Sequence, residues 1–126
     1  MALVEELLQE ARQLDPSSTE SRFRLGEIAE ALRHEFPATA DLHDRLALDL
    51  ELEPDTITEA WFVASAFPPA TRRPGLAWAS FVVLRFHPAR HELVDRAASE
   101  GWGQARLDRE VSAWFAAHHH RPDQSA

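Results

Sequence analysis

Two threonines and two arginines near the middle of the chain have side chains that can hydrogen-bond to a polyanion and neutralise it. Thr56 and Thr58 open an apolar-periodic segment, and Arg72 and Arg73 follow in a connector dense in proline. Small polar side chains at the start of a helix can reach the backbone or a base edge of DNA, and arginines just beyond it can contact phosphates. The alternative is that the arginine pair is ordinary surface or balances nearby acids.

A second set of polar side chains is expected on the last helix of the chain, over residues 104–117. Leu107 and Val111 form part of its apolar side. Gln104, Arg106 and Arg109 are expected on its exposed face. We therefore include these three residues among the candidate DNA contacts.

The residue patterns of common enzymes and metal sites do not occur in this sequence. The chain has no Cys, which excludes disulfides and thiolate zinc sites, and it has no phosphate loop, nucleophile elbow or HExxH pattern. His87 and His91 have the spacing of a helical metal pair, but Pro88 lies between them and no further ligand is placed by the sequence. We interpret His87 as a surface residue, and we expect no enzymatic activity, no cofactor and no metal site.

The elements that position Thr56 and Thr58 are predicted to be a helix-turn-helix over residues 42–67. Apolar side chains recur at helical spacing on both sides of a break at residues 53–55. Pro54 fits the first turn of the second helix, where Asp55 or Thr56 can cap free amides. The tight turn usually contains glycine, but Glu51 stands there. The turn is therefore expected to be longer, shifted toward Pro54, or strained.

Two further helices are predicted ahead of this pair. Residues 2–14 have an amphipathic pattern, and their apolar stripe, which includes Leu7 and Leu8, could dock on the domain or on a second copy of the chain. Residues 17–20 read as a capping box that starts a helix running to about residue 36. Gly26 either lies inside that helix, weakening it by about 1 kcal/mol relative to Ala, or marks a later start.

The C-terminal part is predicted to be helical as well. Residues 76–86 are almost entirely apolar and could form a buried helix or a strand; we choose the helix because no partner strand is visible. Residues 88–117 are predicted to form a second helix pair that Pro88 opens, with Gly101 at its turn. Trp61 and Trp114 are expected to be buried. The predicted fold is all-α: one compact multi-helix domain over residues 1–117, followed by a flexible tail over residues 118–126.

Charge is distributed unevenly along the 126 residues. Residues 1–60 hold fifteen acidic residues and five Arg, a balance of −10, whereas residues 61–126 hold six acidic residues and eight Arg, a balance of +2. Because an acidic protein is repelled by DNA overall, binding requires a local basic surface from the C-terminal half. No apolar run has the length of a signal or transmembrane segment, so the expected location is the cytoplasm.

The order of several short motifs resembles a known group of proteins. The run from Arg24 to Ala29 is followed by residues 46–57, by Trp61-x-x-Ala64-x-Ala66-Phe67-Pro68-Pro69, by Arg72-Arg73, and then by Leu76-x-Trp78 and Gly101-Trp102. This order is similar to small helical proteins of actinobacteria, often plasmid- or phage-borne, that are usually described as helix-turn-helix regulators. It also loosely resembles the DNA-binding segment of ParB/KorB-type proteins, over about residues 23–111.

The resemblance implies a DNA-binding role for Thr56, Thr58, Arg72 and Arg73. The resulting hypothesis is a sequence-specific duplex DNA-binding protein, acting as a homodimer in transcription or in plasmid or phage maintenance. The rival hypothesis is an acidic protein-interaction module, an inhibitor or adaptor that binds another protein through its acidic N-terminal half. The balance of −10 over residues 1–60 supports the rival.

Overall fold

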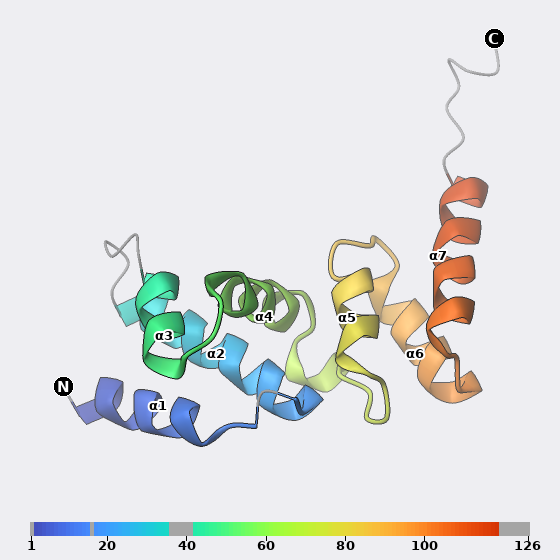
Figure 1. Cartoon of the computed structure of the whole chain (residues 1–126). Coiled ribbons are helices and arrows are strands. Elements are labelled where there is room, and N and C mark those ends of the chain that lie inside the picture. The colour runs from blue at the N-terminus through green and yellow to red at the C-terminus, as the bar shows by residue number, and fades with distance from the viewer. Residues whose placement is uncertain (1, 16, 36–41, 119–126) are drawn as a thin grey trace, which may run out of the picture. The chain divides into compact units, whose positions relative to one another are not determined.

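The computed structural model describes residues 2–15, 17–35 and 42–118, and over these ranges the chain is helical without strands (Figure 1). This confirms the all-α prediction. The chain divides into two compact units, Met1–Thr71 and Arg72–Ala126, where the sequence predicted one domain. None of the described helices has the length and apolar character that crossing a membrane requires.

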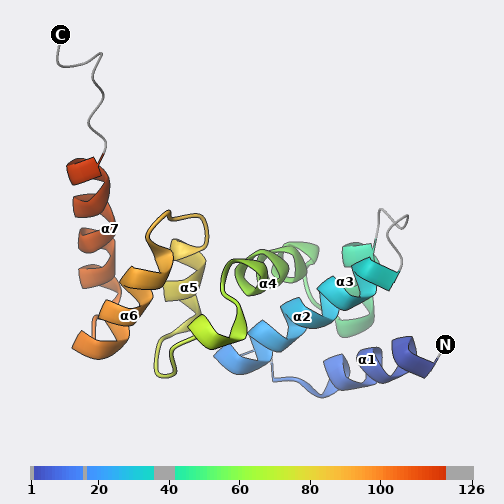
Figure 2. The same cartoon turned by 180° about the vertical axis from the view of Figure 1, so that it is seen from behind.

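The first unit contains four helices: α1 (Ala2–Gln13), α2 (Thr19–Glu35), α3 (Leu42–Leu50) and α4 (Pro54–Ala66), followed by a short 3-10 turn, η1 (Pro69–Thr71). The core lies mainly between α2 and α4, which pack against each other more extensively than any other pair of described helices. Ile28 and Ala29 of α2 and Ile57, Ala60 and Val63 of α4 are fully buried there. Figures 1 and 2 show α1 lying along α2 on the side away from α4.

The N-terminal amphipathic helix docks within its own unit, so the first of the two alternatives for its apolar stripe is observed. Ala11 is buried, and Leu7 and Leu8 are partly buried. Two ion pairs hold α1 in place: Arg24 with Glu10, where Nη2 donates to Oε1 at 2.7 Å, and Arg12 with Asp49 at 3.0 Å.

Gly26 lies inside α2, so the alternative of a later helix start is wrong. A Cβ atom at this position would lie 2.1 Å from the carbonyl oxygen of Ala60 and 2.7 Å from the Cβ of Ala64. The absence of a side chain at Gly26 is therefore what lets α2 and α4 approach each other so closely. The cap of α2 also differs from the prediction, because the Ser18 hydroxyl accepts from the N–H of Ser21 at 3.2 Å and acts as the N-cap in place of a box closed by Glu20.

The second unit contains α5 (Trp78–Leu84), α6 (Arg90–Glu100) and α7 (Gln104–His118). The helical prediction for residues 76–86 is confirmed over α5. However, this segment is not buried all round: Phe81 and Leu84 of α5 are inside, whereas Val83 is 42% exposed and Phe86, just beyond the helix, is 68% exposed.

The connection between α6 and α7 has the predicted glycine turn. Gly101 has a left-handed backbone with φ 68°, and the N–H of Trp102 donates to the carbonyl of Ala97 at 3.0 Å. Trp102, which follows this turn, is buried, at 8% exposed. The start of α6 was predicted wrongly: the helix begins at Arg90, and Pro88 lies in the preceding turn. The predicted tail lies outside the described residues, except for His118, which ends α7.

Candidate nucleic-acid interface

A tight turn joins α3 and α4, although Glu51 occupies the position where glycine was expected. Glu51 has φ 57°. Its N–H donates to the carbonyl of Leu48 at 3.3 Å, and the N–H of Leu52 donates to the carbonyl of Ala47 at 2.8 Å, which is the hydrogen-bond pair that closes a helix before a left-handed residue. Of the three alternatives left open by the sequence, the strained turn is the one observed.

The second helix begins at Pro54, as predicted, because a missing N–H costs nothing at the first helical position. The predicted cap is wrong. Glu53 is the N-cap residue, with an extended backbone and no side-chain hydrogen bond to the helix, whereas Asp55 and Thr56 already lie within α4. Glu53 therefore gives the first amides of α4 no side-chain cap; Pro54 has no N–H, and the N–H of Thr56 donates to the carbonyl of Glu53 at 3.0 Å.

The two threonines lie near the start of α4 and are partly buried. Thr58 Oγ1 lies 3.1 Å from Nδ1 of His43 on α3, so reading a base would require the Thr58 hydroxyl to exchange this partner. Burial lowers the pKa of His43, and the positive charge of Arg33 lowers it further, although Asp44 and Glu30 act in the opposite direction. His43 was not singled out from the sequence, because nothing local indicates that it meets a residue fifteen positions away.

Trp61 is only partly buried, so the prediction that it belongs to the core is wrong. Its indole N–H donates to the carboxylate of Glu30, and the guanidinium of Arg33 lies 4.7 Å from the centre of its ring. Its neighbour Phe62 is 40% exposed. α4 itself thus presents aromatic rings and Asp55, which repels phosphate, and the arginine beside Trp61 comes from α2.

The arginine pair of the connector belongs to the second unit. Arg73 forms an ion pair with Asp95 of α6 at 2.7 Å, with both side chains about half exposed. This contact lowers the pKa of Asp95 and raises the pKa of Arg73. Arg72 is partly buried and also has an interaction partner. Thr56 and Thr58 belong to the first unit, whereas Arg72 and Arg73 belong to the second.

The polar face predicted for α7 is exposed, but its residues differ in how they are engaged. The Gln104 amide donates to Asp108 at 3.1 Å. Arg106 lies 5.2 Å from the ring centre of Trp102 and 3.6 Å from a carboxylate oxygen of Glu110. Arg109 makes no ion pair with any residue that the structure describes. Arg109 is therefore the α7 side chain most available to a phosphate.

His87 was expected at the surface, and this was wrong: it is only 3% exposed. Its Nδ1 accepts from the N–H of Ala89 at 2.9 Å, and its ring contacts Trp114 and Phe115 of α7, at 4.6 and 4.8 Å between ring centres. Trp114 was expected to be buried and is partly exposed. His87 therefore belongs to the aromatic packing of α7. No group of three potential metal ligands occurs among residues 2–15, 17–35 and 42–118.

Comparison with protein-family models, with curated proteins and with solved structures finds no match to this chain. The candidate interface therefore depends on the geometry described above.

Proposed function

We propose that this chain binds duplex DNA, as a homodimeric regulator in the cytoplasm. The observation that carries the proposal is the tight turn between α3 and α4 with its left-handed Glu51, followed by a second helix whose N-cap residue makes no side-chain hydrogen bond. The first turns of α4, with Thr56 and Thr58, supply the contacts that reach the bases. Arg72, Arg73 and Arg109 supply the contacts to phosphates.

Electrostatics sets the conditions under which this binding can be seen. The acidic residues belong mainly to the first unit, so repulsion opposes DNA binding there. The second unit has a net charge of +2, and its arginines supply the attraction to the phosphates of DNA. Since phosphate contacts release condensed counterions, binding should be strongest at low salt.

The proposal is tested by fluorescence anisotropy with labelled duplexes of random and defined sequence, at about 50 and 150 mM salt. Removing both arginines in Arg72→Ala/Arg73→Ala should flatten the negative slope of log affinity against log salt, reducing its magnitude by about 1.8, because each lost phosphate contact contributes about 0.9. Arg12→Ala is the matched control, because it also removes an arginine from an exposed pair with an aspartate. It should leave the slope unchanged.

Base reading is tested separately at Thr58. Thr58→Ala should change the preference among duplex sequences while leaving the salt slope unchanged, because base contacts specify sequence and phosphate contacts do not. Thr58→Ser keeps the hydroxyl and should keep the preference. Absence of duplex binding at about 50 mM salt, with a folded protein by circular dichroism, would rule out the proposal.

A second candidate function is an acidic module that binds another protein, and Leu48 is the observation that favours it. Leu48 is 82% exposed on α3, beside the exposed carboxylates of Asp49 and Glu51. A large apolar side chain next to acids is suited to a partner that offers an apolar pocket with a basic rim. This function is supported if the wild-type protein does not bind duplex DNA and the Leu48→Ser variant no longer binds a basic protein partner that the wild type binds.

A further inference from the structure

An open cleft of about 250 Å³ lies beneath the turn between α3 and α4. Its walls come from the end of α1, the first half of α2 and residues 49–52. Ala11 and Leu25 are buried at its base, and Leu14, Leu50 and Leu52 are partly exposed along its walls. Because clefts for drug-sized ligands usually exceed about 300 Å³, this one is suited to a smaller molecule.

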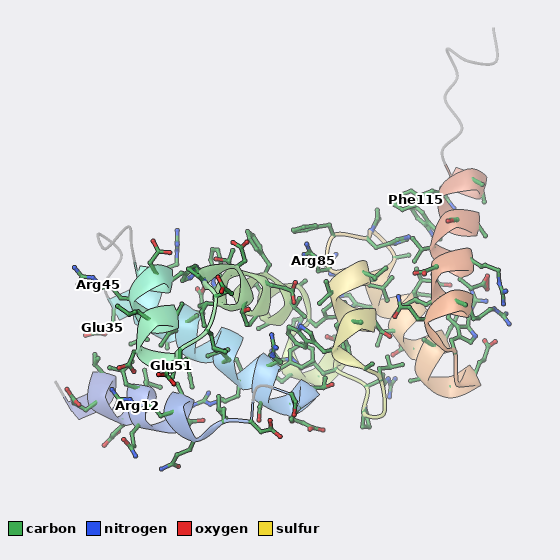
Figure 3. All side chains as sticks on the ribbon, in the orientation of Figure 1. Arg12, Glu35, Arg45, Glu51, Arg85 and Phe115 are labelled. Carbon is green, nitrogen blue, oxygen red and sulfur yellow. The ribbon has the colours of Figure 1, made fainter. Side chains whose placement is uncertain are left out.

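Among the charged side chains that line the cleft, one carboxylate has no oppositely charged partner in the described part of the chain. Arg12 and Asp49 neutralise each other through two hydrogen bonds, of 3.1 and 3.0 Å, from the guanidinium to the two carboxylate oxygens. The Glu51 side chain is exposed and makes no hydrogen bond or ion pair within the described part of the chain. Arg12 on α1 and Glu51 at the end of α3 are labelled in Figure 3, and both line the cleft.

The backbone at Glu51 provides an independent reason to look for a ligand here. Glu51 is the non-glycine residue with positive φ in the described ranges, although glycine adopts this conformation with no steric cost. Residues held in a strained backbone conformation cluster at functional sites. A glycine would close the turn equally well but would leave the cleft without a charge.

The charge of the first unit selects the sign of the ligand. Residues 1–71 have a balance of −10, because residues 61–71 add no charge to the preceding sixty. A cation is therefore drawn to this unit, whereas an anion is repelled. Arg12, the cation on the wall, is already paired with Asp49.

We propose that this cleft binds a small molecule with a protonated amine on a short apolar chain. The ammonium group pairs with the Glu51 carboxylate, and the apolar chain lies against Leu14, Leu50 and Leu52. Such a ligand contacts α1, α2 and the turn together, so it stabilises the position of the turn relative to both helices. This binding does not depend on DNA binding and is measured without DNA.

The test uses n-hexylamine, n-hexanol and hexanoate, which share an apolar chain and differ in charge. The amine is protonated at neutral pH, as a lysine side chain is with its pKa of about 10.4. Amide chemical shifts of the full chain should move at Leu14, Ser21 and Leu52 on addition of hexylamine. Its dissociation constant should be in the millimolar range for so few atoms. The dissociation constant of hexylamine should be at least about threefold lower than that of hexanol or hexanoate, because an ion pair at a partly exposed site contributes a small additional binding energy.

Variants then assign the effect to Glu51. Glu51→Gln should weaken hexylamine binding to the level of hexanol. Glu51→Asn provides a second carboxylate-free variant, because asparagine accepts a left-handed backbone. Glu53→Gln is the matched control, since Glu53 is exposed in the same connection and does not line the cleft, and it should bind like wild type. The proposal is overturned if the three probes bind equally, if Glu51 and Glu53 variants respond alike, or if no shifts occur below roughly 10 mM probe.

Discussion

Replacing Gly26 by alanine tests whether the close approach of α2 and α4 controls the stability of the first unit. Alanine is the better helix former by about 1 kcal/mol, so propensity alone predicts that Gly26→Ala stabilises the protein. The structure predicts the opposite, because the new Cβ would lie 2.1 Å from the backbone oxygen of Ala60. Because this contact is with the backbone of Ala60, no side-chain movement can relieve it.

The size of the effect follows from the displacement that the methyl group requires. Real Cβ contacts start at about 3.0 Å, so α2 must move from α4 by about 0.9 Å. Both helices are fully buried along this surface, at Ile28 and Ala29 on α2 and at Ile57 and Val63 on α4. Overpacking usually costs about 1–3 kcal/mol, and a rigid backbone contact is at the upper end. After the propensity gain, we expect a net loss of about 2 kcal/mol.

Urea unfolding followed by circular dichroism measures this loss. For a urea dependence of about 1.5 kcal/mol per molar, the midpoint should fall by about 1.3 M. Gly103→Ala is the control for adding a methyl group, because nothing lies within 4 Å of its Cβ, and it should shift the midpoint by far less. Ala31→Gly at an exposed position of α2 reports the propensity term alone. An unchanged or raised midpoint for Gly26→Ala would refute the close contact.

Two further predictions concern Glu51 and His87. Glu51→Gly should stabilise the protein by about 1 kcal/mol because it removes the left-handed strain, whereas Glu53→Gly, at an extended backbone position, should not; equal urea midpoints for both variants would contradict this. Burial and the nearby His118 lower the pKa of His87 below 6.5, so the unfolded chain binds more protons and stability should fall as the pH drops below about 6.5. His87→Asn, which retains an acceptor for the N–H of Ala89, should reduce the fall in melting temperature between pH 7.5 and 5.5, while the exposed control His34→Asn should not.

Several features of the fold could be predicted from the sequence because they depend on neighbouring residues. The helical period of the apolar side chains is local, and so are the start of α4 at Pro54 and the end of α6 at Gly101. Proline and glycine restrict or permit particular backbone angles whatever surrounds them. The turn at Glu51 could also be located from the sequence, because the helical pattern of apolar residues stops just before it and resumes just after Pro54.

Tertiary structure decided which side chains are buried and which are already engaged. His87 is buried because two aromatic residues of α7 pack on it, and Trp61 is partly exposed because α2 and α4 meet on the other residues of α4. Arg73 is paired with Asp95, twenty-two residues away, so its availability to DNA could not be read from the connector alone. Contacts of this kind join residues that are distant along the chain, and their energies depend on burial and distance, which no local pattern contains.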